Sequence, residues 1–261
     1  MLGLGSSITS STISSLPPFV NTTTNTNAMT FDGSGDFLQL ADNDDFSFVD
    51  TPFSVAAWVK RSSVSNGGLF HKGTFGNNLS TNEYRVFFVT NRLFIDIGDG
   101  GYNTNARYRR IIFPNDTTNW QHIVITSNGT SGASLGGGNI KVYVNGSEVS
   151  SSGTGGSDAD GLANKSGKFE IGRTNESGFQ HDGQILQFIM WRNKELTQSD
   201  VTYLYADGAA HRDPTQDAES YTSSSSVVLW LPLQSNSNDS SGNGHNFTVN
   251  GDAFHEDDVP F

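Results

Sequence analysis

From Met29 onward, clusters of Gly, Asn, Asp and Ser divide the chain into short runs rich in Phe, Val, Ile and Tyr. Runs of this length and composition predict β-strands, and the polar clusters predict the turns between them. Eleven such runs imply two antiparallel sheets. They are FLQL, FSVAAWVKR, GLFHKG, EYRVFFVT, LFIDIG, RYRRIIF, WQHIVITSN, IKVYVNG, KFEIG, QILQFIMWRN and VVLWLPL.

Two local patterns predict connecting elements. Asn145 and Gly146 lie between valines that alternate along the chain, and this pair favours the positive φ angles of a type I′ hairpin turn. The segment LTQSDVTYLYADG predicts the one clear helix, with Thr197 as its N-cap and Gly208 at its end. We find no internal period of the length that marks solenoids or propellers.

Composition sets the class of protein and excludes several functions. The chain has 18 Phe, 7 Tyr and 4 Trp among 261 residues, and these large rings can fill the space between two sheets. We therefore expect Trp58, Trp120, Phe188 and Trp191 to be largely buried. The chain has no Cys, which excludes disulfides and thiolate sites. A net charge of -12 opposes sequence-independent binding to nucleic acid and to anionic membranes.

Three segments follow from these patterns. Residues 1–28 are mainly Ser, Thr, Asn and Gly, cannot bury enough surface to fold alone, and predict an extended N-terminal arm. Residues 29–251 form the sandwich domain, and residues 252–261 form an acidic C-terminal tail. The first residues lack the basic and apolar regions of a signal peptide, and no run is long enough for a membrane helix. We expect neither export by that route nor membrane insertion.

The order of the phrases carries a resemblance to a known family. FDGSGDFLQL, FSVAAWVKR, WQHIVITSN, IKVYVNGSEV, FEIGR and FQHDGQILQFIMWRNKELTQSDVTYLYADG resemble, in that order, the laminin-G-like branch of the concanavalin A-like lectin/glucanase superfamily. The resemblance implies a jelly-roll sandwich over residues 29–251. Many relatives carry a phrase like WLPLQSNSNDSSGNGHNFTVNG before FDG, whereas here it comes last. Similar C-terminal placement recurs in phage-encoded members of the family.

A loop rich in side-chain oxygens follows the last apolar run. Asp239, Asn243 and Asn246 offer the hard oxygen ligands that Ca²⁺ prefers, and the resemblance favours a Ca²⁺ site. The terminal strands of a jelly roll are neighbours, so Asp32 and Asp36 are further candidate ligands. The alternative is a tight turn in which these side chains bond their own backbone.

Aromatic and polar residues also gather in the segment GDGGYNTNARYRR. Rings that stack on sugar faces, beside Arg and Asn that bond sugar hydroxyls, predict a glycan-binding surface. The candidate residues are Tyr102, Asn103, Arg107, Tyr108 and Arg109. The alternative is that these side chains merely cover an exposed strand.

Catalytic motifs are absent. Jelly-roll glucanases carry their carboxylates as E-x-D-x-x-E on one strand, and none of the Glu residues has that pattern. The six His residues show no H-E-x-x-H spacing, and there is no G-x-S-x-G. We therefore expect that the protein is not an enzyme.

Together these features predict a virion structural protein, an appendage or decoration. Its arm would bind other virion proteins, and its lectin-like domain would contact host-surface glycans. We expect a homo-oligomer, located on the virion. The first alternative is a secreted, extracellular carbohydrate-binding or adhesion module of a bacterium, and the second is a glycoside hydrolase of the jelly-roll glucanase type.

Overall fold

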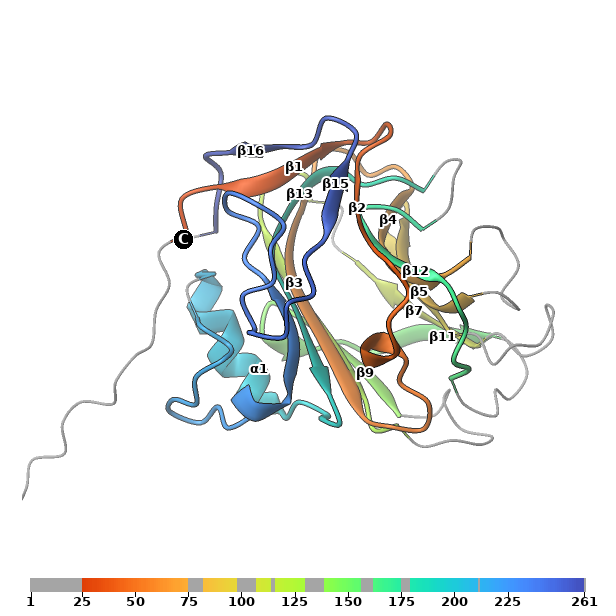
Figure 1. Ribbon diagram of the computed structural model, residues 1–261, viewed down its shortest axis with the longest axis vertical. Coiled ribbons are helices and arrows are strands. Elements are labelled where there is room, and N and C mark those ends of the chain that lie inside the picture. The colour runs from red at the N-terminus through yellow and green to blue at the C-terminus, as the bar shows by residue number, and fades with distance from the viewer. Residues whose placement is uncertain are drawn as a thin grey trace, which may run out of the picture.

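The computed structural model describes residues 25–74, 82–97, 107–113, 116–129, 139–155, 162–174, 179–210 and 212–260, with the backbone alone for 107–112 and 151–155. Its strands form two antiparallel sheets packed face to face, which confirms the predicted jelly-roll class (Figure 1). The N-terminal arm is described only from Asn25 onward, so most of it lies outside this part of the chain.

Each sheet contains eight of the described strands. The first sheet has the order β10-β9-β8-β3-β13-β1-β16, and β14 also pairs with β13. Its strands are β1 (Ala28–Asp32), β3 (Phe53–Arg61), β8 (Gln121–Ser127), β9 (Ile140–Val144), β10 (Ser147–Glu148), β13 (Asp182–Arg192), β14 (Val227–Leu231) and β16 (Phe254–Glu256). The second sheet has the order β11-β7-β6-β5-β4-β12-β2-β15. Its strands are β2 (Phe37–Leu40), β4 (Gly67–Gly73), β5 (Asn82–Val89), β6 (Arg92–Ile97), β7 (Arg107–Ile112), β11 (Ser151–Gly155), β12 (Lys168–Ile171) and β15 (Thr248–Asn250).

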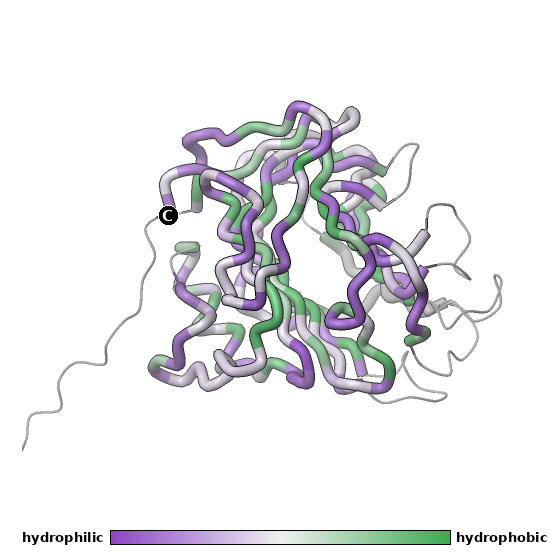
Figure 2. Tube along the Cα trace, viewed as in Figure 1, coloured by the Kyte–Doolittle hydropathy of each residue, from purple (hydrophilic) through white to green (hydrophobic). Residues whose placement is uncertain are grey.

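The main core lies between the two sheets and is rich in phenylalanine. In β3, Phe53, Val55, Ala57 and Val59 point into this core, because side chains alternate along a strand. The ring of Phe53 stacks on that of Phe48, with centroids 4.6 Å apart. Figure 2 shows hydrophobic residues along the strands and mainly hydrophilic ones in many of the turns.

A second apolar cluster covers the outer face of the first sheet. Helix α1 (Gln198–Tyr205) lies against this face, on the side away from the second sheet (Figure 1). Its Val201 and Leu204 pack in one cluster with Ala56 and Val124 from the sheet. The first sheet is therefore buried on both faces over much of its area, and every residue of β8 is buried.

The helix and the hairpin follow their sequence signals. The Thr197 side chain accepts a hydrogen bond from the backbone N–H of Asp200, and the Asp200 carboxylate accepts one from the backbone N–H of Thr197, which completes a capping box. The helix continues as a 3₁₀ turn over Ala206–Gly208. Asn145 and Gly146 have φ angles of 50° and 79°, as a type I′ turn between β9 and β10 requires.

The described residues contain three short 3₁₀ helices, and one of them, η3, is the turn that continues α1. They are η1 (Asp44–Phe46), η3 (Ala206–Gly208) and η4 (Ser224–Ser226). No helix in the described ranges is long and apolar enough to cross a membrane.

The chain remains part of the sandwich beyond residue 251. β15 pairs with β2 in the second sheet, and β16 pairs with β1 in the first. The first and last described strands are thus neighbours, as a jelly roll demands. The expected domain boundary at 251 falls between these two strands, so the acidic tail supplies a strand of the fold.

Trp120 departs from the expected burial. Trp58, Phe188 and Trp191 are 3%, 0% and 0% exposed, as the apolar runs predicted. Trp120 is only half-buried, and the expectation that it lies in the core is wrong. The reason is that Trp120 precedes β8, which begins at Gln121, so the sheet does not fix its side chain between layers.

Candidate functional site

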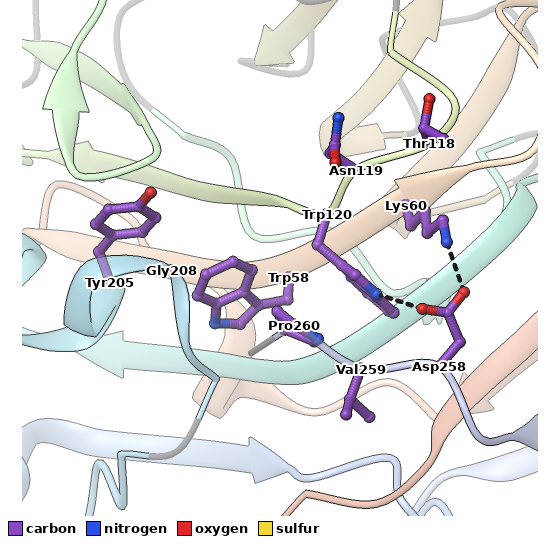
Figure 3. A pocket seen from close by; sticks show the side chains of 10 residues that line it. All are labelled: Trp58, Lys60, Thr118, Asn119, Trp120, Tyr205, Gly208, Asp258, Val259 and Pro260. Carbon is purple, nitrogen blue, oxygen red and sulfur yellow. Dashed lines mark hydrogen bonds and ion pairs between the residues drawn. The ribbon is translucent and has the colours of Figure 1, made fainter.

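A pocket of about 370 Å³ lies on the outer face of the first sheet (Figure 3). It lies between strand β3, the segment before β8, the end of α1 and the segment that follows β16. Its lining residues are Trp58, Lys60, Thr118, Asn119, Trp120, Tyr205, Gly208, Asp258, Val259 and Pro260.

Three aromatic rings form one side of the pocket. Trp58 and Lys60 point outward because the residues that alternate with them in β3 fill the core. The ring of Tyr205, at the end of α1, stacks on Trp58 with centroids 5.8 Å apart and an interplanar angle of 20°. Trp120 and Tyr205 both remain half-buried, so part of each ring faces the pocket.

A charged pair lies beside Trp120, at the other end of the pocket from Tyr205 (Figure 3). The Asp258 carboxylate accepts a hydrogen bond of 2.6 Å from Lys60 Nζ and one of 3.0 Å from the indole N–H of Trp120 (Figure 3). Burial alone would raise the pKa of Asp258, but these two hydrogen bonds outweigh it and hold that pKa below its usual value. Asp258 is therefore an ionised acceptor that orients the Trp120 ring.

A short turn presents the polar rim. Asp116 accepts hydrogen bonds from the backbone N–H groups of Thr118 and Asn119, at 2.8 and 3.0 Å. It also accepts one from Asn119 Nδ2, and these bonds lower the pKa of Asp116 to about 2. Both rim residues are exposed, and Asn119 directly precedes Trp120 in the chain.

His122 lies beneath the aromatic wall as a neutral ring. Its centroid is 4.9 Å from that of Trp58 and 6.1 Å from that of Tyr205. Complete burial lowers its pKa to about 3, so the imidazole carries no charge near neutral pH. It packs against the two rings from the buried side.

The pocket combines aromatic faces with a few fixed polar groups. Aromatic faces beside a small number of fixed polar groups are typical of sites for small polar ligands with apolar faces. Hydrolysis of a glycosidic bond normally needs two carboxyl groups that flank it. Among the described residues that line the pocket, Asp258 is the only carboxylate, and it is held by Lys60 and Trp120.

None of the predicted glycan-binding residues is among the described residues that line the pocket. Tyr102 and Asn103 fall outside the described residues. Arg107, Tyr108 and Arg109 belong to β7 of the second sheet, of which only the backbone is described. Sequence reasoning missed the pocket because it assigned Trp58 and Trp120 to the core. The signal that was available is the polar Thr-Thr-Asn that directly precedes Trp120.

The oxygen-rich loop after β14 is stabilised by its own hydrogen bonds. Asp239 Oδ1 accepts from the backbone N–H groups of Trp230 and Ser241, and Asp239 Oδ2 accepts from the Ser241 hydroxyl and the backbone N–H of His245. The Asn246 side-chain oxygen accepts from the backbone N–H of Asp239 at 2.9 Å. Asn243 Nδ2 donates to the carbonyls of Val227 and Val228. This geometry is that of the turn alternative.

The other two predicted ligands do meet. Asp32 and Asp36 come together with Asp252, and one carboxylate oxygen of each lies within 4.8 Å of the others. Asp36 is 2% exposed and accepts from the backbone N–H groups of Asp32 and Asp252, at 3.1 and 2.8 Å. Burial raises the pKa of Asp36, those two hydrogen bonds lower it, and the two neighbouring carboxylates raise it further. Three hard oxygen donors at this spacing fit a cation such as Ca²⁺.

Comparison with known proteins relates most of the chain to a family. Residues 32–202 match the model of the concanavalin A-like lectin/glucanases superfamily. No curated protein sequence is similar enough to count as a relative. A solved structure described as "a putative carbohydrate binding protein from Bacteroides ovatus ATCC 8483" is 18% identical, with a TM-score of 0.60 over 90% of this chain and 61% of that one. The chain therefore spans less than two thirds of the length of that structure.

A heptameric SAP-like pentraxin from Limulus polyphemus is also similar in structure. It is 16% identical to the chain, with a TM-score of 0.48 over 69% of this chain and 82% of the pentraxin.

Proposed function

The chain belongs to the concanavalin A-like lectin/glucanase superfamily, and on that premise we propose that it is a non-catalytic protein that binds glycans in the pocket of Trp58, Trp120 and Tyr205. The observation that carries the proposal is the fixed Trp120 ring. Its indole N–H is bound to Asp258, and it lines the pocket together with Asn119. Such a ring loses little conformational freedom when a sugar stacks on it.

Substitution of Trp120 tests this proposal. We expect a glycan array to give ligands for the wild-type protein, and Trp120→Ala to bind them at least about tenfold more weakly, because the stacking surface is lost. Phe254→Ala is the matched control, since Phe254 is 52% exposed but lies outside the pocket. It should bind like wild type. Absence of any wild-type ligand, or equal loss in both variants, would refute the proposal.

We also propose that the sandwich holds Ca²⁺ at Asp32, Asp36 and Asp252 and not at the loop of Asp239. The support is the placement of three carboxylates within 4.8 Å of one another. An ion there would offset their mutual repulsion. The melting temperature of the wild-type protein should rise with Ca²⁺ and fall with chelator, and Asp252→Asn should weaken that response. A wild-type melting temperature that is indifferent to Ca²⁺ would contradict the assignment.

We propose finally that the protein is a virion appendage or decoration, whose arm of residues 1–28 binds other virion proteins and whose sandwich contacts host-surface glycans. The support is the Ser/Thr/Asn-rich composition of the arm and the acidic charge of -12. Mass spectrometry of purified particles should find the chain. If it is found free outside cells and not on particles, a secreted carbohydrate-binding or adhesion module is the better description.

A further inference from the structure

A lysine and two carboxylates meet at the second sheet, whereas the pocket lies on the outer face of the first. Lys72 of β4 places its Nζ 2.7 Å from Glu83 Oε1 and 2.7 Å from Asp42 Oδ1. Glu83 comes from the neighbouring strand β5, and Asp42 from the loop after β2. The nitrogen of one amine is therefore within hydrogen-bond distance of two separate acids.

The amine is buried, and its third hydrogen-bond partner is the backbone carbonyl of Lys165, at 3.3 Å. The side chains of Lys72 and Glu83 are both 0% exposed, and that of Asp42 is 38% exposed. The cross-strand neighbours of Lys72 are Tyr84 on one side and Phe169 on the other, and both are buried. The amine is therefore held away from bulk water beside the two acids.

Glu83 lies within hydrogen-bond distance of the Lys72 amine and can exchange a proton with it. Its Oε1 also accepts from the backbone N–H of Lys165 and from the hydroxyl of Ser47, while its Oε2 is buried without a hydrogen-bond partner. Burial raises the pKa of Glu83 against the effect of these bonds and of Lys72. A carboxylate that can take a proton from the amine and return it is a general acid–base group.

We propose that Lys72 and Asp42 join in an intramolecular amide bond, with Glu83 as the general acid–base residue. Glu83 accepts a proton from the Lys72 ammonium, and the free Nζ attacks Cγ of Asp42 to form the N–C bond. Glu83 then passes protons from the nitrogen to a carboxyl oxygen, the C–O bond breaks, and one water leaves through the exposed side of Asp42. An ammonium and a carboxylate become one neutral amide and one water, and Glu83 ends unchanged.

The geometry already favours this step. Nζ lies 2.7 Å from Asp42 Oδ1, and Cγ, the carbon that it would attack, is bonded to that oxygen. The chain contains a matched pair without the other features: Lys60 Nζ lies 2.6 Å from Asp258, but both side chains are partly exposed, at 22% and 31%. The distance from nitrogen to oxygen in the Lys60–Asp258 pair is similar to that in the Lys72–Asp42 pair. The Lys60 side chain is less buried than that of Lys72, and Asp258 is its only carboxylate partner among the described residues.

Intact-mass spectrometry of the denatured full chain tests the proposal. The wild-type protein should be lighter than its sequence mass by one water molecule. Tandem mass spectra of a digest should contain a branched peptide that joins residue 42 to residue 72, and no branch between Lys60 and Asp258. The full sequence mass after long incubation of the folded protein, or a water loss that maps to an aspartyl–glycyl step, would overturn the proposal.

Three variants assign the roles. Glu83→Gln keeps the amine and the acid but removes the proton relay, and Lys72→Arg replaces the amine by a guanidinium that stays protonated. Both should keep the full sequence mass, as should Asp42→Ala. Circular dichroism shows whether each variant is folded. A folded Glu83→Gln protein that still loses water at this pair would contradict the role given to Glu83, and the same result for Asp42→Ala would contradict the bond itself.

Discussion

At the scale of single residues, side chains with ionisable groups are mostly used to hold structure. Asp239, Asp116 and Asp258 each accept several hydrogen bonds that fix a loop or a ring. His122 and His181 are buried as neutral rings with pKa values lowered to about 3 and about 4. The stability of the fold therefore depends on the carboxylates that accept these hydrogen bonds, and on pH through the buried histidines.

The buried His122 should make the protein less stable in acid. Its unfolded pKa is near 6.5 and its folded pKa is about 3, so below pH 6.5 the unfolded chain binds a proton that the folded one does not. This contribution to stability is complete above pH 6.5 and falls by about 2 kcal/mol by pH 5. His122→Phe should reduce the difference between urea midpoints at pH 7 and pH 5. An unchanged difference would show that His122 is already protonated in the fold.

Asp239→Ala should destabilise the protein whether or not calcium is present. The substitution leaves three backbone N–H groups and one hydroxyl without the carboxylate that accepts them. We expect a loss of about 1–3 kcal/mol in the free energy of unfolding. Denaturation in chelator and in calcium measures it, and Asp239→Asn, which keeps one oxygen, should lose less. A loss of stability that is seen only in calcium would indicate that Asp239 binds the ion.

At the scale of elements, strand β13 is paired on both of its sides within the first sheet. β13 pairs with β3 along one side, and along the other with β1 at its start and β14 at its end. Gln187 has a φ of 49° and lies at the register shift between these two halves. β13 therefore pairs both with β1, the first described strand, and with β14, which follows helix α1 in the chain.

The cap of α1 should affect both stability and binding. Thr197→Ala removes half of the capping box and should cost about 1 kcal/mol of stability. Because α1 carries Tyr205 against Trp58, a frayed helix should also weaken glycan binding. Thr202→Ala is a control on the same helix, since its hydroxyl bonds only within the helix. Equal effects of the two substitutions would show that the cap has no special role.

Much of the fold could be predicted from the sequence, because its signals are local. Alternating apolar runs mark the strands, Asn145–Gly146 marks the hairpin, and Thr197 with Asp200 marks the helix start. The pocket could not be predicted in the same way. It depends on Asp258 reaching Trp120 across 138 positions of sequence, and a tryptophan beside a strand gives the same local signal in a core or at a surface.

At the scale of the whole molecule, the segment after residue 251 closes the sandwich. β16 extends the first sheet, and Asp258 beyond it binds Lys60 and Trp120. β1 and β16, the first and last described strands, lie side by side at the edge of the first sheet. That edge therefore needs both ends of the described chain.

Ending the chain at residue 251 tests this dependence. The truncated protein loses the β1–β16 pairing and both bonds to Asp258. We expect a loss of about 2 kcal/mol, or about 4–8 °C in melting temperature. Asp258→Asn in the full chain should show a smaller loss. A truncated protein that melts like wild type would show that residue 251 is the true boundary of the domain.

The pairing of β1 with β16 also determines how the protein responds to tension. Ala28 lies directly opposite Glu256, so the chain enters one strand and leaves the other at the same end of the ladder. A pull through these two points opens the pairs one after another, beginning at Ala28 and Glu256, and does not load all of them in shear. Asp258 lies just beyond Glu256 and would be drawn away from Trp120 first. Mechanical load would therefore dismantle the pocket before the core, and a bound glycan would be released under force.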